Sequence, residues 1–127
     1  MTQLVFGAGL IGGYLAGTLS AQGFDTRLVA RPQIQAKLEA GLTLTDLDGH
    51  RLESVPLRFH SDQQGDAISV LWLTVKCTAV AASLADLQGL VTPNTVVICC
   101  QNGFGSDQLI RDAFPKNTVL NAVVGFN

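Results

Sequence analysis

The feature of this sequence that most constrains its fold is a glycine-rich segment close to its first residue. Residues 2–6 form a short β-prone run, and residues 10–22 carry apolar side chains at helical spacing up to Gly23. Between them, GAGLIG matches G-x-G-x-x-G, a pattern that joins a strand to a helix and presents backbone amides to a dinucleotide pyrophosphate. The alternative is that these glycines serve only the turn. The predicted cofactor-binding residues are Gly7, Ala8, Gly9, Leu10, Ile11 and Gly12.

The rest of the chain alternates predicted strands with predicted helices. Residues 67–75 and 95–100 are apolar in the manner of central parallel strands that are covered on both faces. Residues 42–59 instead alternate around Asp48-Gly49, a strong signal for a β-hairpin. Further strands are predicted at 26–30 and 118–124, and helices at 32–41, 79–90 and 105–114. This order predicts an α/β fold of the Rossmann type, a doubly wound and mostly parallel sheet with a small β insertion.

Composition and charge narrow the class of protein. The chain has 127 residues, 47% of them hydrophobic, which suits one domain with a substantial core. A formal net charge of −2 provides no broad basic field, so we expect no nucleic-acid partner. Glycines interrupt the first apolar run, and no segment has about 20 uninterrupted apolar residues. We therefore expect no signal peptide, no membrane span and a cytoplasmic location.

The cysteines and histidines are interpreted as structural. Cys77, Cys99 and Cys100 lie in apolar surroundings without the spacing of a zinc or CxxC site, so we expect reduced thiols that fill apolar space, and no metal site. Cys99 and Cys100 are neighbours on a predicted strand and should point to opposite faces. His50, His60 and Trp72 also receive structural interpretations, because none belongs to a recognisable motif.

Arg31 favours one kind of dinucleotide. NAD-binding domains usually place an acidic residue about 20 positions after the glycines, where it accepts hydrogen bonds from the ribose 2′-hydroxyl. Here that place holds Val29-Ala30-Arg31, and Asp25 lies too early, before the strand. A guanidinium pairs well with a phosphate and offers no acceptor to a hydroxyl, so Arg31 favours the 2′-phosphate of NADP. The alternative is a solvated loop charge.

Two further segments follow buried strands at the carboxyl edge of the predicted sheet, where open α/β sheets bind ligands. Lys76 follows the strand at 67–75, and its ammonium could contact the cofactor or an anionic substrate. Gln101-Asn102-Gly103 follows the strand at 95–100, and the Asn102 amide can both donate and accept hydrogen bonds. The alternatives are a solvent-exposed lysine and an ordinary Asn-Gly turn.

Together, GAGLIG, VAR at the end of the second strand, and LTVK followed later by QNG resemble the N-terminal domain of the ketopantoate reductase family over essentially the whole chain. The resemblance implies that residues 7–12 hold the pyrophosphate and Arg31 the 2′-phosphate. It also implies that Lys76 and Asn102 line the cleft near the nicotinamide and contact substrate. The family reduces 2-dehydropantoate to pantoate with NADPH, using a lysine general acid and a substrate-binding glutamate on a C-terminal helical domain.

That helical domain is absent from residues 1–127, so we assign no catalytic residue and expect little or no turnover from this chain alone. The stop at Asn127, three residues past a predicted strand, suggests truncation or loss of the second domain. The expected partner is a small 2-oxo acid, and a homodimer is left open. Alternatives are the cofactor domain of another NADP-linked 2-oxo acid or opine-type dehydrogenase, a stand-alone nucleotide-sensing module and, more remotely, an S-adenosylmethionine site.

Overall fold

Six parallel strands form the centre of the fold, in the order β5-β2-β1-β6-β7-β8. The computed structural model describes residues 1–39, 41–45, 48–49, 51–60, 67–101 and 105–123. The strands of the sheet are β1 (Thr2–Phe6), β2 (Thr26–Val29), β5 (Arg58–Phe59), β6 (Ile68–Leu73), β7 (Val96–Cys99) and β8 (Val119–Asn121). The helices are α1 (Leu10–Ala21), α2 (Pro32–Leu38), α3 (Val80–Gln88) and α4 (Ser106–Ala113), and a short 3-10 turn, η1 (Cys77–Ala79), precedes α3.

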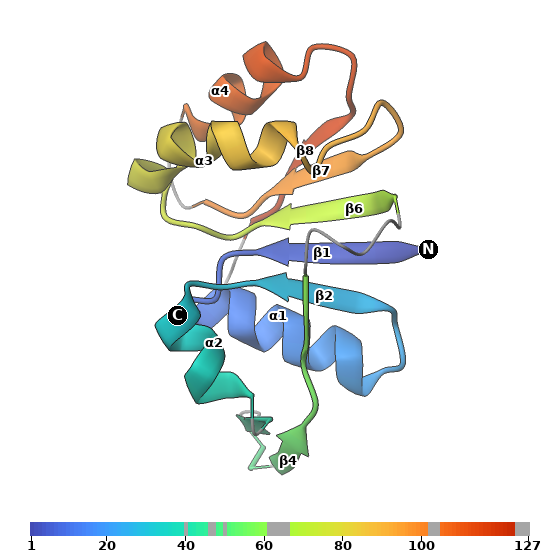
Figure 1. Ribbon diagram of the computed structural model, residues 1–127, viewed down its shortest axis with the longest axis vertical. Helices are drawn as coiled ribbons and strands as arrows, with labels where there is room; N and C mark the ends of the chain where they lie inside the picture. The colour runs from blue at the N-terminus through green and yellow to red at the C-terminus, as the bar shows by residue number, and fades with distance from the viewer. Residues whose placement is uncertain (40, 46–47, 50, 61–66, 102–104, 124–127) are drawn as a thin grey trace.

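Helices cover the two halves of the sheet from opposite faces (Figure 1). Successive side chains of a strand point to opposite faces. In β1, Leu4 belongs to the core cluster that contains Val80 of α3 and Ile110 of α4, whereas Val5 packs with Ala16 of α1. The covering helices therefore change face between β1 and β6. In a doubly wound sheet, the carboxyl ends of the strands at this change are where ligands bind.

The predicted hairpin forms a separate two-stranded antiparallel sheet of β3 (Leu42–Thr45) and β4 (Arg51–Val55). Gly49 in the connection has a φ of +83°, a conformation that favours glycine. The prediction is wrong for the last residues of this segment, because Arg58–Phe59 pairs in parallel with β2 and extends the main sheet. Phe59 packs with Leu28 beside α1, a long-range contact that local alternation cannot reveal.

The other strand and helix predictions are confirmed, with bounds that differ by a few residues. One correction concerns the cysteines: Cys99 and Cys100 are buried as expected, but Cys77 is exposed at the start of η1. The apolar run was predicted to continue to Val75, whereas β6 ends at Leu73 and the chain then turns outward. In the described part of the chain, no helix has the length and apolar character needed to cross a bilayer.

Candidate cofactor site

The glycine loop lies at the carboxyl end of β1 and leads directly into α1. The Gly7 N–H donates to the Val29 carbonyl at 3.1 Å, which attaches the loop to the end of β2. The first helical hydrogen bond runs from the Gly13 N–H to the Gly9 carbonyl, at 2.8 Å. The N–H groups before Gly13 have no acceptor within the helix, because no helical carbonyl precedes them by four residues. Those amides and the positive end of the helix dipole form an environment suited to an anion.

The three motif glycines differ in how closely the rest of the protein packs around them. Gly7 has a φ of +116°, and a Cβ added to it would lie 2.9 Å from Thr74 Oγ1. A Cβ on Gly12 would lie 1.8 Å from the Gly7 carbonyl oxygen. Gly9 has an ordinary φ of −74°, and a Cβ there would meet no protein atom within 4 Å. Packing thus accounts for the glycines at positions 7 and 12 but not for Gly9, where no protein atom fills the space that a side chain would take.

Thr74, just beyond β6, holds the other side of the loop. Its hydroxyl lies 2.8 Å from the carbonyl oxygen of Gly7 and 3.1 Å from that of Phe6. Its backbone N–H also donates to the Phe6 carbonyl at 3.0 Å. The start of the loop is therefore hydrogen-bonded to β2 on one side and to the end of β6 on the other.

Gln101 in turn holds the end of β6. Its Nε2 donates to the carbonyl oxygen of Leu73 at 2.8 Å and to that of Val75 at 2.9 Å. These two carbonyls flank Thr74 in the sequence. The sequence analysis identifies neither Thr74 nor the contacts of Gln101, and the available signal was a hydroxyl residue near the carboxyl end of a largely apolar run.

The predicted cationic residues lie on connections at the carboxyl edge of the sheet. Arg31 is exposed at the N-terminal end of α2, two residues after the end of β2, and the Val29 carbonyl bonded to Gly7 belongs to the same connection. Lys76 is exposed directly before η1, next to the Val75 carbonyl that Gln101 holds. Asn102 lies outside the described residues, as does His50.

Asp25 lies at the opposite edge of the sheet, before β2 begins. Its carboxylate accepts a hydrogen bond from the Thr2 hydroxyl at 3.0 Å and pairs with Arg58 at 3.2 Å. The sequence-based exclusion of Asp25 as a ribose ligand agrees with this position.

A second polar group joins α4 to β8. Asn121 Nδ2 and Arg111 Nε donate to the Asp107 carboxylate at 3.3 and 3.4 Å, and these partners lower the pKa of Asp107 below its ordinary value.

Burial, with a smaller contribution from Asp107, raises the pKa of the Cys99 thiol to about 11. The Cys99 thiol is therefore neutral and poorly nucleophilic at neutral pH.

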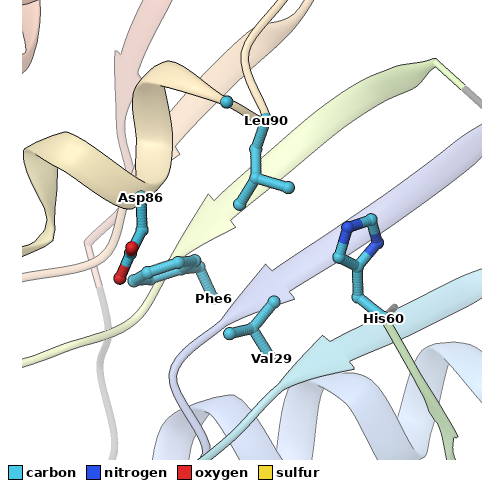
Figure 2. A pocket seen from close by; sticks show the side chains of 6 residues that line it. Phe6, Val29, His60, Asp86 and Leu90 are labelled. Carbon is cyan, nitrogen blue, oxygen red and sulfur yellow. The ribbon is translucent and has the colours of Figure 1, made fainter. Parts of the chain in front are cut away.

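A hollow of about 240 Å³ lies on the face of the sheet opposite α1 (Figure 2). Figure 2 shows Phe6 and Val29 at the ends of their strands, His60 beside them and Leu90 following α3. None of the predicted cofactor-binding residues lines this hollow. The hollow nevertheless adjoins the start of the glycine loop, because Phe6 directly precedes Gly7 and the Val29 carbonyl accepts the Gly7 N–H.

Comparison with known proteins identifies the family. Residues 3–127 match the sequence profile of the family described as ketopantoate reductase PanE/ApbA. The chain belongs to this family. Relatives similar to this chain include the uncharacterized oxidoreductase YkpB of Bacillus subtilis, 27% identical over 97% of the chain, and a 2-dehydropantoate 2-reductase of Streptococcus pyogenes serotype M3, 26% identical over 97%. The chain spans 40% of the length of each relative.

Solved structures of other proteins share the fold of this chain. A PanE/ApbA family ketopantoate reductase from Ralstonia eutropha JMP134 superposes with a TM-score of 0.86 at 23% identity, covering 100% of this chain and 42% of that one. D-mandelate dehydrogenase in a ternary structure with NADH and anilino(oxo)acetate superposes with a TM-score of 0.81 at 24% identity, covering 100% and 41%. The chain is thus an NAD(P)-binding Rossmann domain of a family of NAD(P)-dependent oxidoreductases.

Proposed function

We propose that this chain is the NADP(H)-binding domain of an oxidoreductase that reduces a 2-oxo acid, as 2-dehydropantoate 2-reductase does in forming pantoate on the route to coenzyme A. The observation that carries the proposal is Gly9, whose lack of a side chain the protein's own packing does not require. A pyrophosphate against the amides of residues 8–12 accounts for the open space there. The bound cofactor would supply the hydride.

Arg31 is the residue that selects NADP(H) over NAD(H) in this proposal. It is exposed at the end of the β2 connection, the region that faces the adenosine ribose in Rossmann domains. A charge-assisted hydrogen bond to the 2′-phosphate contributes about 1.5–3 kcal/mol. Because 1.4 kcal/mol is tenfold in affinity, the expected preference for NADPH is about 10- to 150-fold.

Lys76 and Asn102 are proposed to lie near the nicotinamide and the substrate carboxylate. Lys76 follows β6 at the ligand-binding edge, and it is exposed there, where its ammonium would attract an anion. Reduction also requires groups that hold the 2-oxo acid over the nicotinamide. We place these groups in the part of the relatives' length that this chain does not span, so residues 1–127 alone should bind cofactor and show little or no turnover.

Calorimetric titration of this chain with NADPH and with NADH tests the proposal. The wild type should bind NADPH more tightly by the stated factor, and Arg31→Ala should bring the two affinities together. Lys37→Ala is a matched control, because Lys37 is an exposed cation in the last turn of the same helix. Equal affinities of the wild type for both cofactors would refute the assignment of Arg31.

A second candidate is the cofactor domain of another 2-oxo acid dehydrogenase of this family. The similarity in fold to D-mandelate dehydrogenase favours keeping it, since that protein was solved with NADH and an oxoacetate compound. Fold alone does not determine substrate. Turnover of the full-length protein with 2-dehydropantoate, compared with aryl-substituted 2-oxo acids, separates the two candidates.

A further inference from the structure

We propose that Thr74 is a positioning residue for cofactor binding: its hydroxyl fixes the Gly7 carbonyl so that the next amides of the glycine loop face the pyrophosphate, and Gln101 holds Thr74 in place. This inference rests on the proposed function, because it assigns a role within the same site. Neither side chain needs to touch the cofactor.

The hydroxyl of Thr74 has one hydrogen to donate and two carbonyl oxygens within reach. Gly7 O, at 2.8 Å, is closer than Phe6 O, at 3.1 Å. The Phe6 carbonyl already accepts the Thr74 N–H, whereas the hydroxyl is the only side-chain donor to Gly7 O among the described contacts. The Gly7 carbonyl is therefore the group that depends most on this hydroxyl.

The orientation of the Gly7 carbonyl determines the orientation of the following amide. In a trans peptide the C=O of one residue and the N–H of the next point in opposite directions. No cis peptide bond occurs in the described chain. When Gly7 O points inward to Thr74, the Ala8 N–H points away from β6. Within the described residues, the Ala8 and Gly9 amides donate to no backbone carbonyl, so they remain available to a ligand.

Gln101 acts one step further back. Both hydrogens of its Nε2 are used, on Leu73 O and Val75 O, and these bonds bracket the Thr74 backbone. The opposite amide orientation would place Oε1 against two carbonyl oxygens, so these acceptors determine which way the amide points. Its Oε1 is buried without a hydrogen-bond partner among the described residues, a cost that a purely space-filling side chain would not incur.

Loss of the hydroxyl should loosen the loop without unfolding the domain. The Gly7 N–H to Val29 bond and the Thr74 N–H to Phe6 bond are both backbone contacts and remain in Thr74→Val. Valine also keeps the branched shape of threonine. The expected result is a native fold whose loop amides are less well ordered.

The experiment combines ¹⁵N relaxation of the cofactor-free chain with NADPH titration. In Thr74→Val, the order parameters of the Ala8 and Gly9 amides should fall from about 0.85 towards 0.6, and the affinity for NADPH should fall about tenfold. Thr74→Ser, which keeps the hydroxyl, should restore both. Thr43→Val is the control, because Thr43 is an exposed threonine in β3, part of the separate hairpin.

Each outcome decides something. Loop order parameters equal to those of the wild type in Thr74→Val overturn the inference, whatever the affinity. A loosened loop in a chain whose wild type binds neither NADPH nor NADH supports the role of Thr74 and refutes the proposed function. Gln101→Met provides a second test if Thr74→Val fails to fold, because it keeps the Thr74 hydroxyl and should still loosen the same two amides.

Discussion

Alanine at Gly12 tests how tightly the glycine loop packs. A Cβ at this position would lie 1.8 Å from the Gly7 carbonyl oxygen, far inside the 3.4 Å at which ordinary van der Waals contact begins. Overpacking costs about 1–3 kcal/mol where neighbours can move. Here the neighbour is a backbone carbonyl that Thr74 also holds, so we expect the upper end, about 3 kcal/mol. For a domain of this size the melting temperature should fall by about 12 °C.

Gly9 and Gly13 provide the comparison. A Cβ at either position would meet nothing within 4 Å. Gly13→Ala, inside α1, should stabilise the helix by up to about 1 kcal/mol. Gly9→Ala should leave the free energy of unfolding within about 0.5 kcal/mol of the wild type. It should nevertheless weaken NADPH binding about 10- to 100-fold, because the methyl group occupies the space proposed for the pyrophosphate.

Thermal unfolding and calorimetric titration of the three variants separate packing from binding. Gly12→Ala should lose stability, Gly9→Ala should lose affinity alone, and Gly13→Ala should keep the fold. A Gly12→Ala protein that melts with the wild type would refute the packing argument. A Gly9→Ala protein with wild-type affinity for NADPH would refute the placement of the phosphates.

Three further predictions use other parts of the molecule. Iodoacetamide should modify Cys77 rapidly in the native chain and Cys99 and Cys100 only after denaturation, because the latter two are buried. Mass spectrometry of the treated chain measures this. Burial raises the pKa of Cys99 from 9.0 to about 11, so the unfolded chain deprotonates first and the free energy of unfolding should decline from pH 9 to 11. Urea denaturation at several pH values should show a smaller decline in Cys99→Ala, and an equal decline in the two proteins would count against this cause. Asp25→Asn should cost about 0.5–1 kcal/mol in chemical denaturation through its contacts with Thr2 and Arg58, yet leave NADPH affinity unchanged because it lies at the opposite edge.

Local sequence signals predicted most of the fold. Strand, glycine turn and helix follow one another at residues 2–22, and each is determined by neighbours in the sequence. The short strand Arg58–Phe59 was assigned to the hairpin because its place depends on pairing with β2, about 30 residues earlier. The interpretation of Cys77 as a filler of apolar space fails because Cys77 lies past the end of β6, in the exposed turn η1 that leads to α3.

The candidate site was predictable to the extent that its chemistry lies in motifs. The glycines and the cation Arg31 stand at fixed spacings from a strand, and the structure places them on neighbouring connections. Thr74 and Gln101 were not predicted, because their hydrogen bonds go to backbone carbonyls 67 and 26–28 residues away in the sequence. Backbone acceptors have no residue-type signature, so such contacts appear only once the strands are paired.

The most direct test of the central claim is an NMR titration of the ¹⁵N-labelled chain with NADPH. We expect the largest amide shifts at residues 7–13, at Arg31 and at Lys76. Shifts centred instead on His60, Asp86 and Leu90 around the hollow, with the glycine loop unchanged, would contradict this claim.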